Sequence, residues 1–179
     1  LYTKRIIKSN RIQFDERIKM HEDLLFYYDY LTHCKSIYLS KSICYNYTYQ
    51  SNATSLSHTL PPYSMLLTMS DNFMTRFPAL FDYLGITDET YIKRIISEYG
   101  MSSRRAAVYS LYYYHIKKSE RTQFFKEQQS IFKCLYNTYG YKPVKVKHLL
   151  VFLFTSARCI PIKVKDLAFT ILYNYRHLI

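Results

Sequence analysis

The side chains that could carry out acid–base or nucleophilic chemistry are present in this chain, but their spacing matches no catalytic arrangement. Only three of the 13 acidic residues lie beyond residue 100, so few carboxylates are available there for acid–base work. The histidines lack the HExxH spacing of zinc peptidases, and His58, between Ser57 and Thr59, lacks the glycines of a nucleophile elbow. We therefore predict that the protein is not an enzyme and has no cofactor and no metal site.

The four cysteines are Cys34, Cys44, Cys134 and Cys159. None belongs to a CxxC pair, so the sequence predicts neither a zinc ribbon nor a thioredoxin-like redox motif. An even number of cysteines permits two disulfides, in any of three connectivities. Four reduced, buried cysteines in an intracellular protein are the alternative.

Two features favour secretion. Asn46-Tyr47-Thr48 and Asn52-Ala53-Thr54 are both N-glycosylation sequons in a polar stretch, so Asn46 and Asn52 are candidate glycan sites. The chain also starts at Leu1 and not at methionine, as a mature chain does after removal of a signal peptide. We therefore expect a secreted glycoprotein, with an intracellular protein as the alternative.

The net charge of +12 is concentrated in the C-terminal part of the chain. Residues 1–100 contain 11 Lys/Arg and 10 Asp/Glu, whereas residues 101–179 contain 14 and 3. A segment this basic is attracted to nucleic acid, to membrane surfaces and to acidic proteins, unless its lysines only keep the protein soluble. No apolar run is long enough for a transmembrane segment.

Tyrosine is unusually common, with 21 residues, and Tyr112, Tyr113 and Tyr114 are consecutive. Three successive helical residues cover about 200° of a helix, so at least one of these rings should be exposed. An exposed tyrosine beside basic residues suits a binding surface and also stacks on single-stranded nucleic acid, although most of the tyrosines are expected to fill the core. The binding residues predicted here are Tyr113, Lys117, Lys118 and Arg121.

A short repeat lies near the C-terminus. Pro143-Val-Lys-Val-Lys-His-Leu149 is followed 18 residues later by Pro161-Ile-Lys-Val-Lys-Asp-Leu167. A proline fixes φ at the start of each copy, and we expect each copy to begin a helix. Side by side, two such helices would form an anion-binding edge, and the alternative is simply two similar helix starts. The lysines of this predicted edge are Lys145, Lys147, Lys163 and Lys165.

Apolar residues at helical spacing cover most of the chain, so we predict an all-α fold, a compact multi-helix bundle. Pro78 is predicted to start a short helix that stops at Gly85, and Thr87 to cap a helix that ends at Gly100. Further helices are predicted from Arg11 to Leu31, from Ser102 or Ser103, and from Ser119 to Gly140. The polar loop from Gln50 to Pro62 divides an N-terminal helical segment, 1–60, from a basic bundle, 61–179, unless the two form one continuous domain.

The cysteines and tyrosines together suggest a family. Cys34 and Cys44 enclose Tyr38, while Cys134 and Cys159 enclose several tyrosines. Two such cysteine–tyrosine–cysteine elements in a small tyrosine-rich chain resemble the bicycle (bi-cysteine) effector proteins of gall-forming aphids. The resemblance implies a salivary protein delivered into plant tissue to alter host development, with each cysteine pair stapling the helices of its own half. Each such disulfide would add about 3 kcal/mol of stability.

The leading hypothesis is therefore a secreted salivary effector, a virulence protein of a host–parasite interaction that binds a host macromolecule without catalysis. The alternatives are an intracellular, viral or organellar nucleic-acid-binding helical protein that uses its basic C-terminal half, and a saposin-like lipid-binding module. The cysteines distinguish them, because the absence of any disulfide would favour the binder of nucleic acid.

Overall fold

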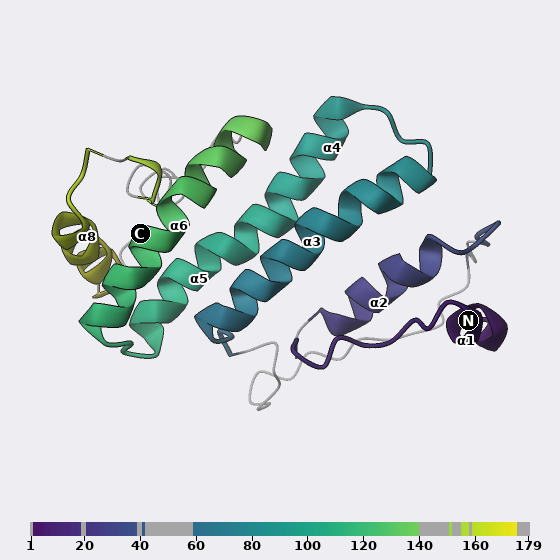
Figure 1. Cartoon of the computed structure of the whole chain (residues 1–179), viewed down its shortest axis with the longest axis horizontal. Helices are drawn as coiled ribbons and strands as arrows, with labels where there is room; N and C mark the ends of the chain where they lie inside the picture. Colours follow the sequence, from purple (N-terminus) through teal and green to yellow (C-terminus); the bar gives the residue numbers. More distant parts are fainter. Residues whose placement is uncertain are drawn as a thin grey trace.

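The computed structural model in Figure 1 describes residues 2–18, 21–38, 41, 59–139, 151, 155–157 and 159–174, and no strand occurs among them. The all-α prediction is confirmed. In chain order the helices are α1 (Lys4–Ser9), α2 (Glu22–Leu31), α3 (Tyr63–Tyr83), α4 (Glu89–Ile96), the π-helix η2 (Ser97–Met101), α5 (Ser102–Tyr113), α6 (Lys118–Tyr139) and α8 (Ile162–Asn174).

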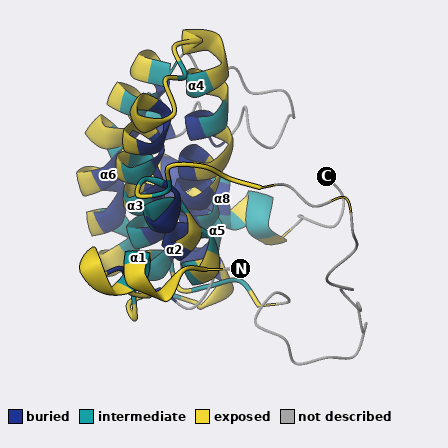
Figure 2. Ribbon diagram, turned by 90° about the vertical axis from the view of Figure 1, so that its right-hand side faces the viewer, coloured by how far each residue is buried: buried dark blue, intermediate teal, exposed yellow. Residues whose placement is uncertain are grey.

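The long helices lie side by side (Figure 1). The helix α3 is in the middle, with α2 on one flank and α5 on the other, followed by α6 and α8. One hydrophobic core runs from Leu25 of α2 through Phe73 and Phe77 of α3 to Phe169 of α8. Figure 2 shows that buried residues occupy the inner faces of these helices and exposed residues the outer faces. The core therefore joins the segment before residue 60 to the helices after it.

The helix α3 continues through Pro78, so the prediction that Pro78 starts a new helix is wrong. Phe73, Phe77 and Phe81 are spaced four residues apart and stack with ring centroids 5.5 and 5.7 Å apart. Burying these rings outweighs the cost of proline inside a helix, about 3 kcal/mol. The predicted stop at Gly85 is correct, because its φ of +66° allows the chain to leave the helix.

A second predicted helix end is also absent. Gly100 lies inside η2, which joins α4 to α5 without a break. A Cβ atom on Gly100 would lie 2.7 Å from Cγ of Met74, so this glycine serves the close approach of α3 and does not end a helix. The N-cap of α4 is Asp88 and not Thr87, since the Asp88 carboxylate accepts hydrogen bonds from the backbone N–H groups of Thr90 and Tyr91.

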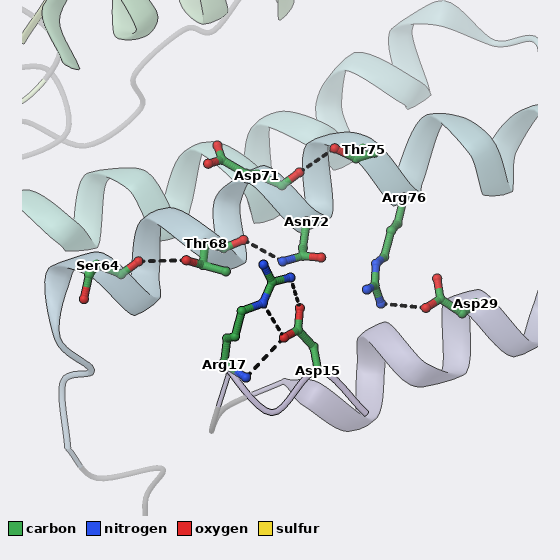
Figure 3. Close-up of polar contacts among 9 residues, drawn as sticks. All are labelled: Asp15, Arg17, Asp29, Ser64, Thr68, Asp71, Asn72, Thr75 and Arg76. Atoms are coloured by element: carbon green, nitrogen blue, oxygen red, sulfur yellow. Dashed lines mark hydrogen bonds and ion pairs between the residues drawn. The ribbon is translucent and has the colours of Figure 1, made fainter. Parts of the chain in front are cut away.

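The prediction of one helix from Arg11 to Leu31 is wrong, because the described helix in this range is α2, which begins only at Glu22, and α1 ends before Arg11. Arg11 and His21 have φ values of 54° and 61°, which do not fit a right-handed helix. Ion pairs accompany this part of the chain (Figure 3). Arg76 of α3 pairs with Asp29 of α2 at 2.8 Å. The Arg17 guanidinium hydrogen-bonds to Asp15 and lowers the pKa of that carboxyl to about 2.

The structure does not support the predicted disulfide staples. Cys34, Cys134 and Cys159 are free thiols, and Cys44 lies outside the described residues. Cys134 on α6 and Cys159 just before α8 are both exposed, and they form no disulfide with each other. The helices α6 and α8 are joined instead by non-covalent contacts, among them the stacked rings of Phe125 and Phe169, whose centroids are 5.5 Å apart.

Candidate anion-binding surface

The binding residues predicted from the tyrosine cluster lie at the end of α5, in the turn that follows and in the first turn of α6. The helix α5 ends at Tyr113, and His115 then has a φ of 51°. The N–H of Ile116 donates to the carbonyl of Leu111 at 2.9 Å, which closes the turn in the manner of a Schellman motif. Tyr113 is 43% exposed, and Lys117 and Lys118 are exposed beside it in the chain.

Arg121 differs from these neighbours because it is committed to an ion pair within the protein. Its Nε and Nη2 atoms donate to the two carboxylate oxygens of Asp166 at 2.6 and 3.0 Å. Its Nη1 atom donates to the carbonyl of Ile116 at 2.7 Å. Asp166 therefore holds this guanidinium between α6 and α8, where Arg121 is only partly exposed, and its role in binding stays a prediction.

Tyr112 completes this network. Its hydroxyl donates to Asp166 at 3.0 Å, and its ring lies 4.9 Å from the Cζ atom of Arg121. Burial is the main cause that raises the pKa of Tyr112, and the neighbouring Asp166 raises it further. The hydrogen bond from Arg121 lowers the pKa of Asp166, so that carboxyl stays ionised and the tyrosine stays neutral. These groups hold α5, α6 and α8 together. Their pKa values are shifted away from neutral pH, so they are not suited to proton transfer there.

A pocket of about 170 Å³ opens beside this network, between the end of α5, the start of α6 and the last turns of α8. Its lining combines aromatic rings with hydroxyl, amide, imidazole and guanidinium groups. The lining residues are Tyr112, His115, Arg121, Thr170, Tyr173 and Asn174.

The helix α8 does not display the lysines of the repeat as predicted. Lys163 is exposed, but Lys165 is fully buried, with 0% exposure. Residues two apart on a helix point about 200° away from each other, and Lys165 shares the inner side of α8 with Asp166 and Phe169. Its Nζ atom has no hydrogen-bond partner among the described residues, and burial lowers its pKa. Lys145 and Lys147 lie outside the described residues.

The outer side of α8 is correspondingly apolar. Val164, Leu167 and Ile171 are 48%, 61% and 50% exposed. The polarity of this helix is therefore partly reversed, with a lysine inside and three aliphatic side chains outside, which is why Lys165 does not contribute to the predicted edge.

The remaining predicted features either lie outside the described residues or are not found among them. Asn46 and Asn52 lie outside the described residues. Within the described part of the chain, no group of three or more His, Cys, Asp or Glu side chains is arranged to hold a metal ion. None of the helices described there is long and apolar enough to cross a membrane.

Sequence reasoning missed Asp166, Thr170, Tyr173 and Asn174. Asp166 carried a usable signal, because it is one of only three acidic residues after residue 100 and such a residue in a basic segment is expected to pair. The other three had no signal of their own, since only the packing of α8 against α5 places them at the pocket.

Comparisons with protein-family models, with curated proteins and with solved structures found no match to this chain.

Proposed function

We propose that the protein binds single-stranded nucleic acid through the surface around the turn between α5 and α6. The observation that carries this proposal is the exposed ring of Tyr113 close in the chain to the exposed Lys117 and Lys118. Lysines attract the phosphates of a nucleic-acid strand, and tyrosine rings stack on its unpaired bases.

The balance of exposed charge supports an anionic partner. Of the three acidic residues after residue 100, Asp166 is neutralised by Arg121, which leaves Glu120 and Glu127. These two are outnumbered by the exposed basic residues described in the same part of the chain, which are Lys117, Lys118, Lys126, Lys133 and Lys163.

The free cysteines also favour nucleic-acid binding over the secreted, disulfide-stapled effector. A secreted, disulfide-stapled protein needs paired cysteines, and among the described residues Cys34, Cys134 and Cys159 form no disulfide. Free thiols are typical of a reducing compartment, where nucleic acid is the most abundant polyanion. We therefore rank nucleic-acid binding above the effector hypothesis.

Charge neutralisation tests this function. The double variant Lys117→Gln/Lys118→Gln should bind a fluorescent single-stranded oligonucleotide about tenfold more weakly at low salt, because two lysines no longer neutralise phosphates. The matched control is Lys4→Gln/Lys8→Gln, which removes the same charge from exposed positions on α1. Equal weakening by both double variants would mean that only net charge matters and would contradict a site at this turn.

A secreted effector that binds a host macromolecule is the second candidate, favoured by the cysteine–tyrosine elements and by the sequons at Asn46 and Asn52. Expressed from its complete coding sequence in insect cells, such a protein would reach the medium with N-glycans that a glycosidase removes. Retention of an unglycosylated chain inside the cells would contradict it.

A further inference from the structure

We infer that the pocket lined by Tyr112, Arg121 and Tyr173 receives one unstacked nucleobase of the bound strand, an inference that rests on the proposed function. At about 170 Å³ the pocket is smaller than the roughly 300–1,000 Å³ of sites for drug-sized ligands, so it suits a group of one or two rings. A nucleobase is the group of that size that a nucleic-acid strand offers.

Aromatic rings form part of the wall of the pocket, where Tyr112 is buried and Tyr173 is partly exposed. Tyr112 and Tyr173 stack with their centroids 6.3 Å apart and their planes 29° apart. The hydroxyl of Tyr112 is fixed by Asp166, so this aromatic wall is held in place before any ligand arrives. Stacking of a base on an aromatic side chain contributes to binding whatever the base, because every base has a π face.

The charge of the pocket favours a neutral ligand over a phosphate. Arg121 is the cation at its wall, and Asp166 already balances that charge through two hydrogen bonds. A phosphate placed there would compete with Asp166 and meet a like charge. A base, which is polar but uncharged, does neither.

Hydrogen-bonding groups for the edge of a base remain on the lining. Arg121 has five N–H groups, of which Asp166 and the Ile116 carbonyl take three and the Tyr112 hydroxyl takes a fourth, so one donor remains among the contacts of the described residues. The amide of Asn174 supplies both a donor and an acceptor. Thr170 donates its hydroxyl proton to the Asp166 carbonyl at 2.8 Å, and its oxygen lone pairs stay available as acceptors.

The lysines of the proposed surface lie close in sequence to residues that line this pocket. Lys117 and Lys118 lie between His115 and Arg121, which both line it. Phosphates held by the two lysines would therefore leave one base within reach of the pocket. The contacts divide into phosphate contacts that position the strand and base contacts inside the pocket.

The experiment compares an oligodeoxythymidine with an abasic oligomer of the same length, each titrated against the full chain. The inference predicts that the abasic oligomer binds at least about fivefold more weakly, since it has no base to stack in the pocket. Equal affinities would overturn the base pocket and also stacking on Tyr113, but would leave binding of the strand through its phosphates intact. Binding of neither oligomer would instead contradict the proposed function.

The variant Asn174→Ala tests whether the base-dependent part of the affinity comes from the pocket. It should weaken binding of oligodeoxythymidine several-fold and leave binding of the abasic oligomer unchanged. The matched control Asn137→Ala, at an exposed position of α6, should change neither affinity. Base-dependent binding that survives Asn174→Ala but disappears in Tyr113→Ala would place the base on Tyr113 and overturn the inference.

Discussion

Lys165 is a lysine in a fully buried environment, with no hydrogen-bond partner for its Nζ atom among the described residues. Burial lowers its pKa below the ordinary value of 10.5. Between that lowered pKa and 10.5 the unfolded chain holds the proton and the folded chain does not, so the free energy of unfolding rises with pH across this interval. At neutral pH the buried ammonium therefore works against folding.

Replacing this lysine should stabilise the protein. Lys165→Met keeps the length of the side chain and removes the charge, so we expect the free energy of unfolding to increase by about 1–3 kcal/mol at neutral pH. The matched control Lys163→Met, at an exposed position, should change it by less than about 0.5 kcal/mol. Urea unfolding measures both, and a loss of stability in Lys165→Met would mean that the ammonium has a stabilising partner.

For the ion pair between Arg121 and Asp166 we predict the opposite effect, a lower free energy of unfolding when one partner is replaced. Removing one partner leaves a buried charge without compensation, so Arg121→Met and Asp166→Leu should each cost on the order of 3 kcal/mol. The double variant should cost clearly less than the sum of the two, because no unpaired charge remains. Additive losses in urea unfolding would show that the two side chains do not interact in solution.

Among the helices, α3 carries a proline at an exposed position in its interior. Pro78→Ala restores a backbone donor and helix propensity, and it frees the unfolded chain slightly. The net expectation is a gain of about 1–2 kcal/mol in the free energy of unfolding, measured with urea.

Pro62 provides the matched control, since it precedes the first turn of α3 with a φ of −55° that proline prefers. Pro62→Ala should lower stability by up to about 1 kcal/mol through the unfolded state alone. If Pro78→Ala behaved like Pro62→Ala, Pro78 would lie at a helix start, as its sequence context had indicated.

The sequence predicted elements well where local and tertiary preferences agree. The predicted helix from Ser119 to Gly140 corresponds to α6, and Gly85 ends α3 as expected. Pro78 and Gly100 are local stop signals that packing overrides, through the column of phenylalanines in one case and the approach of Met74 in the other. Pairwise contacts between distant segments cannot be seen in a local pattern.

The candidate site was predictable to a similar extent. Tyr113, Lys117 and Lys118 are exposed, as expected from a tyrosine cluster followed by lysines. Lys165 was misassigned to the surface because the sequence does not reveal which side of α8 faces the core. Hydrophobic spacing indicates that side only when the inner residues are apolar, and α8 buries a lysine and an aspartate.

Across the protein as a whole, the buried Tyr112 and the partly buried Tyr28 predict that stability is sensitive to alkaline pH. Burial is the main cause that raises the pKa of Tyr28 to about 12 and that raises the pKa of Tyr112 as well. Above the ordinary value of about 10, the unfolded chain loses these protons before the folded chain does, so stability falls as the pH rises from about 10 towards 12.

The midpoint of urea unfolding should therefore decrease from about pH 10 upwards. The opposing contribution of Lys165 is complete by its ordinary pKa of 10.5, so the tyrosines dominate beyond that value. An unfolding midpoint that stays constant to about pH 12 would show that these hydroxyl groups are accessible to solvent in the folded protein.

Binding of single-stranded nucleic acid by this chain is tested most sharply by the salt dependence of its affinity. Each phosphate contact releases counterions, so the dissociation constant for a single-stranded oligonucleotide should rise by about tenfold or more between roughly 50 and 200 mM salt. In Lys117→Gln/Lys118→Gln the slope of log affinity against log salt should become shallower by about 0.7 for each phosphate that is no longer neutralised. Binding that is absent at about 50 mM salt, or that does not change with salt, would contradict the proposed function.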